Sequence, residues 1–285
     1  MKRVAVIPNQ TKDLDLKVTR AVIAKLKGLG FDPCVERKYE SLDASGAELV
    51  DSFSGEFSFI VVIGGDGSVI DSSRFAIDSD IPLLGINLGK VGYLVEVDPD
   101  RLDKLDGLIS SNYVIEEKML LSVAKYSCGG EVVFSERFAV NDVVVSHDDY
   151  FGISDFMVEN QREDHVRLRA DGVIVSTPQG STAYSLSAGG PIISHTLESI
   201  TVTPVCPHSF FNRAIVYGPE EKIKISNTGE SVLNVSVDGR LFSKLETGEY
   251  CLIEKGEKRL KMITFGESNV FSTLSKKIKS VQDVL

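Results

Sequence analysis

The chain has 285 residues, of which 42% are hydrophobic and 25% charged, an ordinary composition for a globular protein of about two domains. The formal net charge of -10 argues against a nucleic acid or a membrane surface as partner, because both are bound through basic faces. No stretch resembles a signal peptide or approaches the roughly 18 apolar residues of a membrane span. The four cysteines and four histidines lack metal-ligand spacing, and we expect a cytoplasmic protein with reduced thiols.

Strands and helices are expected to alternate over the first hundred residues. Strand patterns cover residues 2–8, 31–35, 59–63 and 81–86. A first helix is predicted from apolar residues at helical spacing, with Gly30 as its stop: Leu14, Val18, Val22, Leu26 and Leu29. Residues 37–56 are polar and irregular, and a second helix is expected from Ser68. The alternation predicts a parallel, Rossmann-like α/β domain over residues 1–100.

The glycine-rich turn at residues 64–67 is the most informative stretch of this half. Asp66 stands among Gly64, Gly65 and Gly67, where a buried strand is expected to lead into a helix. Glycines let a ligand approach backbone N–H groups, and a helix N-terminus favours phosphate. A carboxylate at this point suits the activation of a hydroxyl that attacks a phosphoryl group. The same residues also suit an ordinary glycine turn.

Beyond residue 111 the pattern changes to short strands separated by turn signals. Strands are predicted at residues 113–126, 131–146, 154–159, 166–176, 199–205, 214–217, 222–226, 231–237, 250–254 and 260–265. This predicts a β-rich, two-layer sandwich-like domain over residues 112–266. Before it we expect a short helix with Leu102, Leu105, Leu108 and Ile109 on one face, and after it a helix within 270–285 that packs back on the first domain.

Two further stretches carry polar groups suited to a ligand. In residues 171–191, small hydroxyl residues adjoin Tyr184, whose ring can cover a base or sugar. Asn141 beside Asp142 can bond base edges and ribose hydroxyls. A capped helix with a buried tyrosine and a polar strand end remain the structural alternatives. Residues 85–90 imitate a phosphate-binding P-loop, but the spacing is short and Val91 stands where a serine or threonine is needed.

Taken together, these stretches resemble the NAD kinases, which use ATP to phosphorylate the 2′-hydroxyl of the adenosine ribose of NAD. The resemblance covers residues 64–67, 85–94, 141–142, 171–191, 203–213 and 235–239. Phosphofructokinases and lipid kinases share the glycine-aspartate turn, whereas residues 176–191 are specific to this family. The resemblance implies an α/β N-terminal domain and a β-rich C-terminal domain.

The resemblance also implies roles for individual residues. Asp66 would activate the 2′-hydroxyl, and Gly67 would help to hold the substrate. Further NAD-binding positions are matched by Asn141, Asp142, Asp171, Thr182, Ala183 and Tyr184. We expect backbone amides around Gly64 and Gly65 to cradle ATP phosphates, and candidates for phosphate-facing cations are Arg74, Lys90 and Arg213. Gln179, Tyr93 and the shorter acid Asp142 depart from the usual family residues.

We therefore expect an NAD kinase that works with Mg²⁺ or another divalent cation and assembles, by resemblance, into a homodimer or homotetramer. Its predicted small-molecule partners are NAD and ATP. Polyphosphate as donor and NADH as acceptor remain open at this stage. A lipid or sugar kinase with the same turn and a pyridine-nucleotide sensor without turnover are the alternative functions.

Overall fold

The computed structural model describes residues 2–89, 92–148, 153–162, 164–208, 212–266 and 273–275. Contacts divide the chain into two compact units, Met1–Glu117 with Leu260–Leu285, and Lys118–Arg259. The chain runs from one unit into the other within β6 (Val114–Tyr126) and β17 (Tyr250–Thr264). An α/β first unit and a β-rich second unit confirm the predicted fold class. No helix among the described residues is long and apolar enough to cross a membrane.

The first unit is built on a parallel sheet in the order β5 (Leu83–Asn87), β4 (Phe59–Gly64), β1 (Lys2–Pro8), β2 (Phe31–Glu36) and β3 (Glu48–Val50). The end of β17 adds to it beside β5. The register pairs Pro8 with Ile63 and Gly64 with Asn87, so the strands β1, β4 and β5 end side by side. The loops that follow them therefore share the carboxyl edge of the sheet, where α/β proteins bind ligands.

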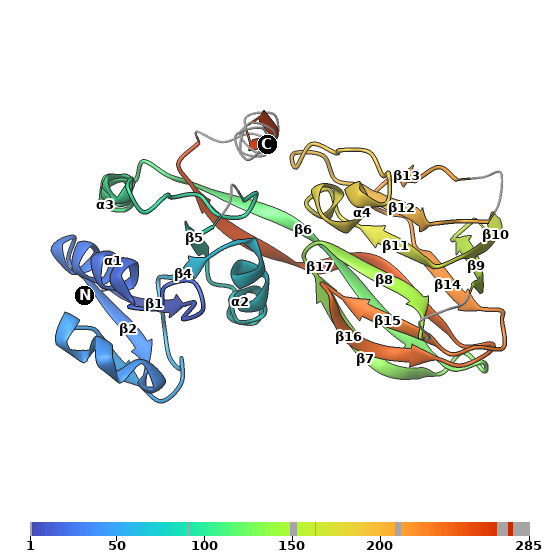
Figure 1. The fold of residues 1–285 in the computed structure, drawn as a ribbon, viewed down its shortest axis with the longest axis horizontal. Helices are drawn as coiled ribbons and strands as arrows, with labels where there is room; N and C mark the ends of the chain where they lie inside the picture. The colour runs from blue at the N-terminus through green and yellow to red at the C-terminus, as the bar shows by residue number, and fades with distance from the viewer. Residues whose placement is uncertain are drawn as a thin grey trace. The chain divides into compact units, whose positions relative to one another are not determined.

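Helices α1 (Lys17–Gly28) and α2 (Asp66–Ser79) pack on this sheet (Figure 1). Val61 and Ile63 of β4 join the core cluster that contains Ile23 and Leu26 of α1. Because side chains alternate along a strand, Ile60 and Val62 point to the other face, and α2 packs against the same strand. Coverage of both faces explains why the sequence of β4 is an unbroken apolar run.

Three expectations for the first unit were wrong in detail. Leu14 lies outside α1 and is 82% exposed, because the Asp13 carboxylate accepts the N–H groups of Val18 and Thr19 and so starts the helix later. The polar stretch 37–56 is ordered into a 3-10 helix (Arg37–Ser45) and β3. Helix α2 begins at Asp66 rather than at Ser68. The predicted stop at Gly30 is confirmed by its φ of 83°.

Two further segments of the first unit also depart from the prediction or lie partly outside the described residues. The expected helix is divided into a 3-10 helix (Leu102–Asp106) and α3 (Gly107–Ser110). Leu105 and Leu108 are buried as expected, whereas Ile109 is exposed. Residues 273–275 are helical, and the rest of the helix expected within 270–285 lies outside the described residues.

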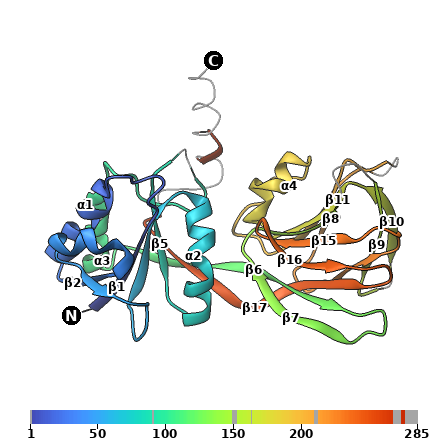
Figure 2. The ribbon, with the colours of Figure 1, turned by 60° about the horizontal axis from the view of Figure 1, so that its bottom comes forward.

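The second unit is a sandwich of two sheets (Figure 2). One sheet contains β10 (His165–Ala170), β9 (Ser154–Asn160), β14 (Ile223–Asn227), β17, β6 and β7 (Val132–Ala139). The other has the order β13 (Ile215–Tyr217), β12 (Ile200–Val205), β11 (Gly172–Ser176), β8 (Asp142–His147), β15 (Leu233–Val237) and β16 (Arg240–Leu245). One core cluster fills the space between them. A 3-10 helix (Gly180–Thr182) and α4 (Tyr184–Ser187) lie over β11.

Strand boundaries in this unit differ from the prediction at several turns. The expected strands 131–146 and 166–176 are each two strands, separated at Asn141 and Asp171. The expected strands 250–254 and 260–265 are one continuous strand, β17, and β16 was missed. Apolar and polar residues continue to alternate through the short turns, so this periodicity alone did not reveal where one strand ends and the next begins. The contacts between residues place the end of the second unit at Arg259, whereas the domain predicted from the sequence ended at residue 266.

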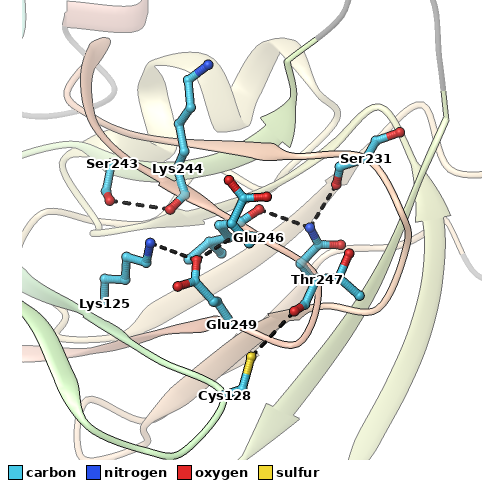
Figure 3. Close-up of polar contacts among 10 residues, drawn as sticks. Lys125, Cys128, Ser231, Ser243, Lys244, Glu246, Thr247 and Glu249 are labelled. Carbon is cyan, nitrogen blue, oxygen red and sulfur yellow. Dashed lines mark hydrogen bonds and ion pairs between the residues drawn. The ribbon is translucent and has the colours of Figure 1, made fainter.

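A buried ion pair fixes the turn between β16 and β17 (Figure 3). Lys125 of β6 places its Nζ 2.7 Å from Glu249, and both side chains are largely buried, with 10% and 16% exposed. Glu249 also accepts the N–H of Glu246 at 2.7 Å. Burial opposes ionisation of Glu249, but the bonds from Lys125 and Glu246 outweigh it and lower the pKa of the carboxyl.

The variant Lys125→Met should lose about 3–5 kcal/mol of unfolding free energy at pH 7, because it leaves a buried carboxylate without its counter-ion. A carboxyl whose pKa is lowered by folding stabilises the protein above its unfolded pKa and loses this contribution as the pH falls. The penalty should therefore shrink on acidification, and urea unfolding at pH 7 and pH 4 measures it. The double variant Lys125→Met with Glu249→Leu should recover most of the loss, and a double variant as unstable as the single one would contradict this account.

Candidate functional site

The glycine turn after β4 is wedged between the loops that follow β1 and β5. A Cβ on Gly64 would lie 2.2 Å from the Ser68 hydroxyl, so no side chain fits there. Asn9, in the loop after β1, donates its amide to that hydroxyl at 2.7 Å. Leu88, after β5, donates its N–H to the Gly64 carbonyl at 2.7 Å. Three neighbouring loops therefore fix the backbone from which Asp66 projects.

Asp66 is the first residue of α2, and its carboxylate holds a neighbouring loop. One oxygen accepts the N–H of Tyr93 and the other that of Leu94, each at 2.9 Å. Gly92 is required beside it, because a Cβ there would lie 2.2 Å from the Asp66 carboxylate. Burial, and then the charge of Asp66, raise the pKa of the Tyr93 hydroxyl. A carboxylate has about four acceptor positions, so two N–H bonds leave room for a hydroxyl proton.

The three cations predicted to face phosphate have different surroundings in the structure or lie outside its described residues. Arg74 lies about 12 Å along α2 from Asp66, exposed and 3.7 Å from Asp78. Arg213 donates to the side chain of Asn212 at 2.6 Å. Lys90 lies outside the described residues. A cation that the sequence analysis missed, Lys12, has its amine beside the turn, 2.7 Å from where a Cβ on Gly65 would be. Its position directly after the first strand, on the expected ligand-binding edge, was the available signal.

The second unit has a pocket of about 470 Å³, within the usual range for small-molecule sites. It lies on the outer face of the second sheet, since Asp142, Val144 and Ser146 of β8 alternate with the core residues Val143 and Val145. Its lining consists of Asn141, Asp142, Val144, Ser146, Ala183, Tyr184, Ser236, Asp238 and Gly239. Four of the residues predicted from two distant motifs therefore meet at one cavity.

Backbone contact explains why those two motifs meet. Thr177 donates its N–H to the Asn141 carbonyl at 2.9 Å and its hydroxyl to the Val140 carbonyl at 2.7 Å. A Cβ on Gly180 would lie 2.0 Å from the Asn141 carbonyl oxygen, so only glycine permits this approach. The segment that carries Ala183 and Tyr184 is thereby fixed against residue 141.

Of the other residues predicted in this unit, Tyr184 lines the pocket, whereas Thr182 and Asp171 do not. Tyr184 is 46% exposed, so its ring is available to a planar ligand and is not the buried tyrosine of the structural alternative. The Thr182 hydroxyl donates to the Gln179 carbonyl at 3.0 Å. Asp171 precedes β11, and its neighbour Gly172 pairs with Ser146 at the far end of the pocket.

Asp238, which the sequence analysis did not single out, organises one wall of the pocket. It forms with Gly239 a two-residue hairpin turn between β15 and β16, in which both residues have positive φ, 48° and 75°. Aspartate followed by glycine is typical of such turns, and this was the available signal. The Asp238 carboxylate accepts the N–H groups of Val140, Asn141 and Asp142 at 2.9, 2.8 and 3.2 Å.

A buried carboxyl group, that of Asp142, and a partly buried one, that of Asp238, therefore adjoin each other at the pocket. Burial, and then the charge of Asp238, raise the pKa of Asp142 to about 7. Burial also raises the pKa of Asp238, but three backbone N–H groups stabilise its ionised form. We therefore assign the proton of the pair at neutral pH to Asp142, which makes its carboxyl group a hydrogen-bond donor to a ligand.

Comparison with known proteins shows the family to which the chain belongs. Residues 18–113 match the family model of the ATP-NAD kinase N-terminal domain, and residues 140–265 match that of the ATP-NAD kinase C-terminal domain. The chain belongs to the NAD kinase family. An NAD kinase of Caldanaerobacter subterraneus subsp. tengcongensis is 34% identical over 98% of this chain and 99% of its own length. One of Clostridium perfringens is 33% identical over 99% of this chain and all of its own.

Solved structures of similar proteins agree with the family assignment. The yeast NADH kinase, solved in complex with NADH, has a TM-score of 0.85 over 98% of this chain and 88% of its own, and at 21% identity it supports the fold. An NAD kinase from Archaeoglobus fulgidus, solved with ATP, has a TM-score of 0.73 at 27% identity over 96% of this chain and 99% of its own. The lipid-kinase, sugar-kinase and sensor alternatives find no support in these comparisons.

The variant Asp142→Asn should change how stability depends on pH. A folded pKa of about 7, above the ordinary 3.8, means that the folded protein keeps a proton that the unfolded chain releases, so the parent loses stability as the pH rises toward 7. The neutral variant should gain about 2–3 kcal/mol on the parent between pH 5 and pH 8 in urea unfolding.

Asp148→Asn is the matched control, because the exposed Asp148 carboxyl has its pKa lowered by Lys244 and Asn234 and is ionised throughout this range. Its stability difference from the parent should stay constant between pH 5 and pH 8. Parallel pH profiles for Asp142→Asn and the parent would contradict the assignment of the proton.

Proposed function

We propose that this protein transfers the γ-phosphoryl group of ATP to the 2′-hydroxyl of the adenosine ribose of NAD, producing NADP, with Asp66 as general base. Family membership supports the reaction. The observation that carries the role of Asp66 is its carboxylate, held by the N–H groups of Tyr93 and Leu94 at the N-terminus of α2 with acceptor positions to spare. In this role it accepts the proton of the hydroxyl, at an oxygen–oxygen distance of about 2.6–3.2 Å, while the hydroxyl oxygen attacks the γ-phosphorus and the bond to the bridging oxygen breaks, so that ADP leaves.

The pocket of the second unit is proposed to bind NAD. The exposed ring of Tyr184 covers a planar part of the dinucleotide, and Asn141 and Asp142 bond its base edges or ribose hydroxyls. The proton assigned to Asp142 lets this residue donate, while the Asn141 side chain can donate and accept. Ala183 lines the pocket beside Tyr184. By the family resemblance, Asp171 and Thr182 of the second unit and, separately, Gly67 of the first unit are also proposed to contact NAD.

The donor is proposed to bind at the glycine turn with a divalent cation. Within residues 2–89, 92–148 and the other described ranges, no group of three histidine, cysteine, aspartate or glutamate side chains is placed to hold a metal ion. Mg²⁺ that accompanies ATP is commonly held by phosphate oxygens and water. The backbone around Gly64 and Gly65 supplies N–H groups at a helix N-terminus, which suits the phosphates.

Location and assembly complete the proposal. Free cysteines at 34, 128, 206 and 251 suit a reducing compartment, which supports the cytoplasm. Homo-oligomers are proposed to form through the second unit, where exposed apolar side chains line two strands: Val132, Val133 and Phe134 of β7 and Leu241 of β16. Exposed apolar patches of this kind are typical of protein interfaces.

The direct test is to incubate the protein with ATP, Mg²⁺ and either NAD or NADH and to detect the 2′-phosphorylated product. We expect NADP from NAD, and the NADH arm shows whether the reduced form is accepted. In the variant Asp66→Asn, kcat should fall about 10²- to 10⁴-fold with little change in KM for NAD, because the base is lost and the pocket is not.

The amide that Asp66→Asn introduces has only one acceptor oxygen, so this variant should also lose about 1–3 kcal/mol of stability through an unpaired N–H of Tyr93 or Leu94. Thermal unfolding separates this cost from the loss of turnover. Asp78→Asn on the exposed side of α2 is the matched control and should keep the parental kcat. A kcat near the parental value in Asp66→Asn would refute the assigned role.

Light scattering should give a mass of two or four chains of 31.1 kDa. Phe134→Glu should shift the protein toward the monomer, because it places a charge on the apolar surface of β7. Leu14→Glu, at an apolar residue of the first unit that is even more exposed than Phe134, should leave the mass unchanged. A monomeric parent protein would exclude the proposed assembly.

A further inference from the structure

The loop after β1 brings a lysine amine to the glycine turn. A Cβ on Gly65 would lie 2.7 Å from the Lys12 Nζ, and one on Gly89 would lie 3.3 Å from it. The amine therefore occupies space that side chains at these two positions would fill. Gly65 precedes α2 and Gly89 follows β5, so the amine stands at the point where the loops after three parallel strands meet.

The backbone of this loop is tied to the turn. Asn9 donates its N–H to the Ile63 carbonyl at 2.9 Å and its side-chain amide to Ser68 at 2.7 Å. Lys12 in turn donates its N–H to the Asn9 carbonyl at 3.1 Å, and Thr11 donates to the Asn9 side chain. The position of the Lys12 backbone therefore follows that of the strand-to-helix turn, although its side chain is exposed.

The charge of this amine has no neutralising neighbour in the part of the chain that the structure describes. Among the described residues no carboxylate lies within ion-pair distance of Lys12, whereas Lys25 and Lys261 of the same unit pair with Asp106 and Asp80, each at 2.6 Å. The first N–H groups of α2, at Asp66 and Gly67, have no acceptor in the described part of the chain, as is usual at a helix start. An ammonium group beside such N–H groups is complementary to an anion.

We propose that Lys12 binds the phosphoryl chain of the donor at residues 64–67. The inference rests on the proposed function and adds to it the residue that neutralises the donor. The Asp66 carboxylate and the donor phosphates are both negative, and their mutual repulsion opposes close approach. The ammonium group of Lys12, beside Gly65, offsets the negative charge of the phosphates. The backbone N–H groups of the turn donate hydrogen bonds to the phosphate oxygens. Arg74 pairs with Asp78 two turns along α2 and is less well placed for this role.

The test compares Lys12→Met and Lys12→Arg with the control Lys2→Met. Lys2 is the first residue of β1, about 20 Å from the carboxyl end of that strand, so Lys2→Met removes the same charge from the opposite edge of the sheet. Steady-state kinetics give KM for ATP and for NAD separately. Titration calorimetry with inorganic tripolyphosphate reports binding of the phosphoryl chain without adenine and without turnover.

Lys12→Met should raise KM for ATP about 10- to 100-fold and weaken tripolyphosphate binding by a similar factor, with KM for NAD within about twofold of the parent. Lys12→Arg should retain most of the donor affinity because it keeps the charge, and Lys2→Met should match the parent in each assay. Weaker ATP binding with unchanged tripolyphosphate binding would place Lys12 against another part of ATP and overturn the proposal. So would a Lys12→Met protein that forms NADP with the parental KM for ATP. A parent protein that forms no NADP refutes the proposed function instead, and the calorimetric comparison still decides whether Lys12 binds phosphate.

Discussion

Three successive backbone N–H groups, at Val140, Asn141 and Asp142, share one acceptor group, the carboxylate of Asp238. Buried N–H groups without acceptors are costly, so this interaction fixes the chain between β7 and β8. Once residue 141 is fixed, Thr177 can bond to its carbonyl and Gly180 can pack against it. The pocket wall thus depends on a hairpin turn almost a hundred residues further along the chain. Burial, and then the charge of the same carboxylate, raise the pKa of Asp142 to about 7, which favours a protonated carboxyl group at the pocket.

The first unit uses an aspartate in a similar way, with a different chemical result. Asp66 accepts two N–H groups from the segment that follows Gly92, so it too holds a loop in place. Asp238 is largely committed to its three donors, whereas Asp66 keeps acceptor positions for a substrate. In the proposed role, Asp66 both fixes a loop and receives the substrate proton, so it is positioned before the substrate arrives, as catalysis by orientation requires.

Positive groups gather at one turn of this protein, although the protein as a whole is negatively charged. The chain carries a net charge of -10, yet its proposed substrates are anionic nucleotides. Backbone N–H groups at the start of α2 and the amine of Lys12 provide positive potential at one turn. Other basic side chains of the first unit form ion pairs with carboxylates. Lys25 pairs with Asp106, and Arg37 pairs with Asp51. Net charge therefore argues against polymeric anions as partners and says little about small ones.

The sequence by itself determined the fold class, the strand-to-helix turn at Asp66 and the two motifs that meet at the pocket, because apolar periodicity and glycine spacing are local properties. Tertiary structure alone decided which distant groups meet. Asp238 and Lys12 belong to no local pattern of catalytic residues, and their roles follow from a hairpin and from parallel strands that end side by side. The exposure of Leu14 and the continuity of β17 were also decided by contacts, since a capping carboxylate and strand pairing override local pattern.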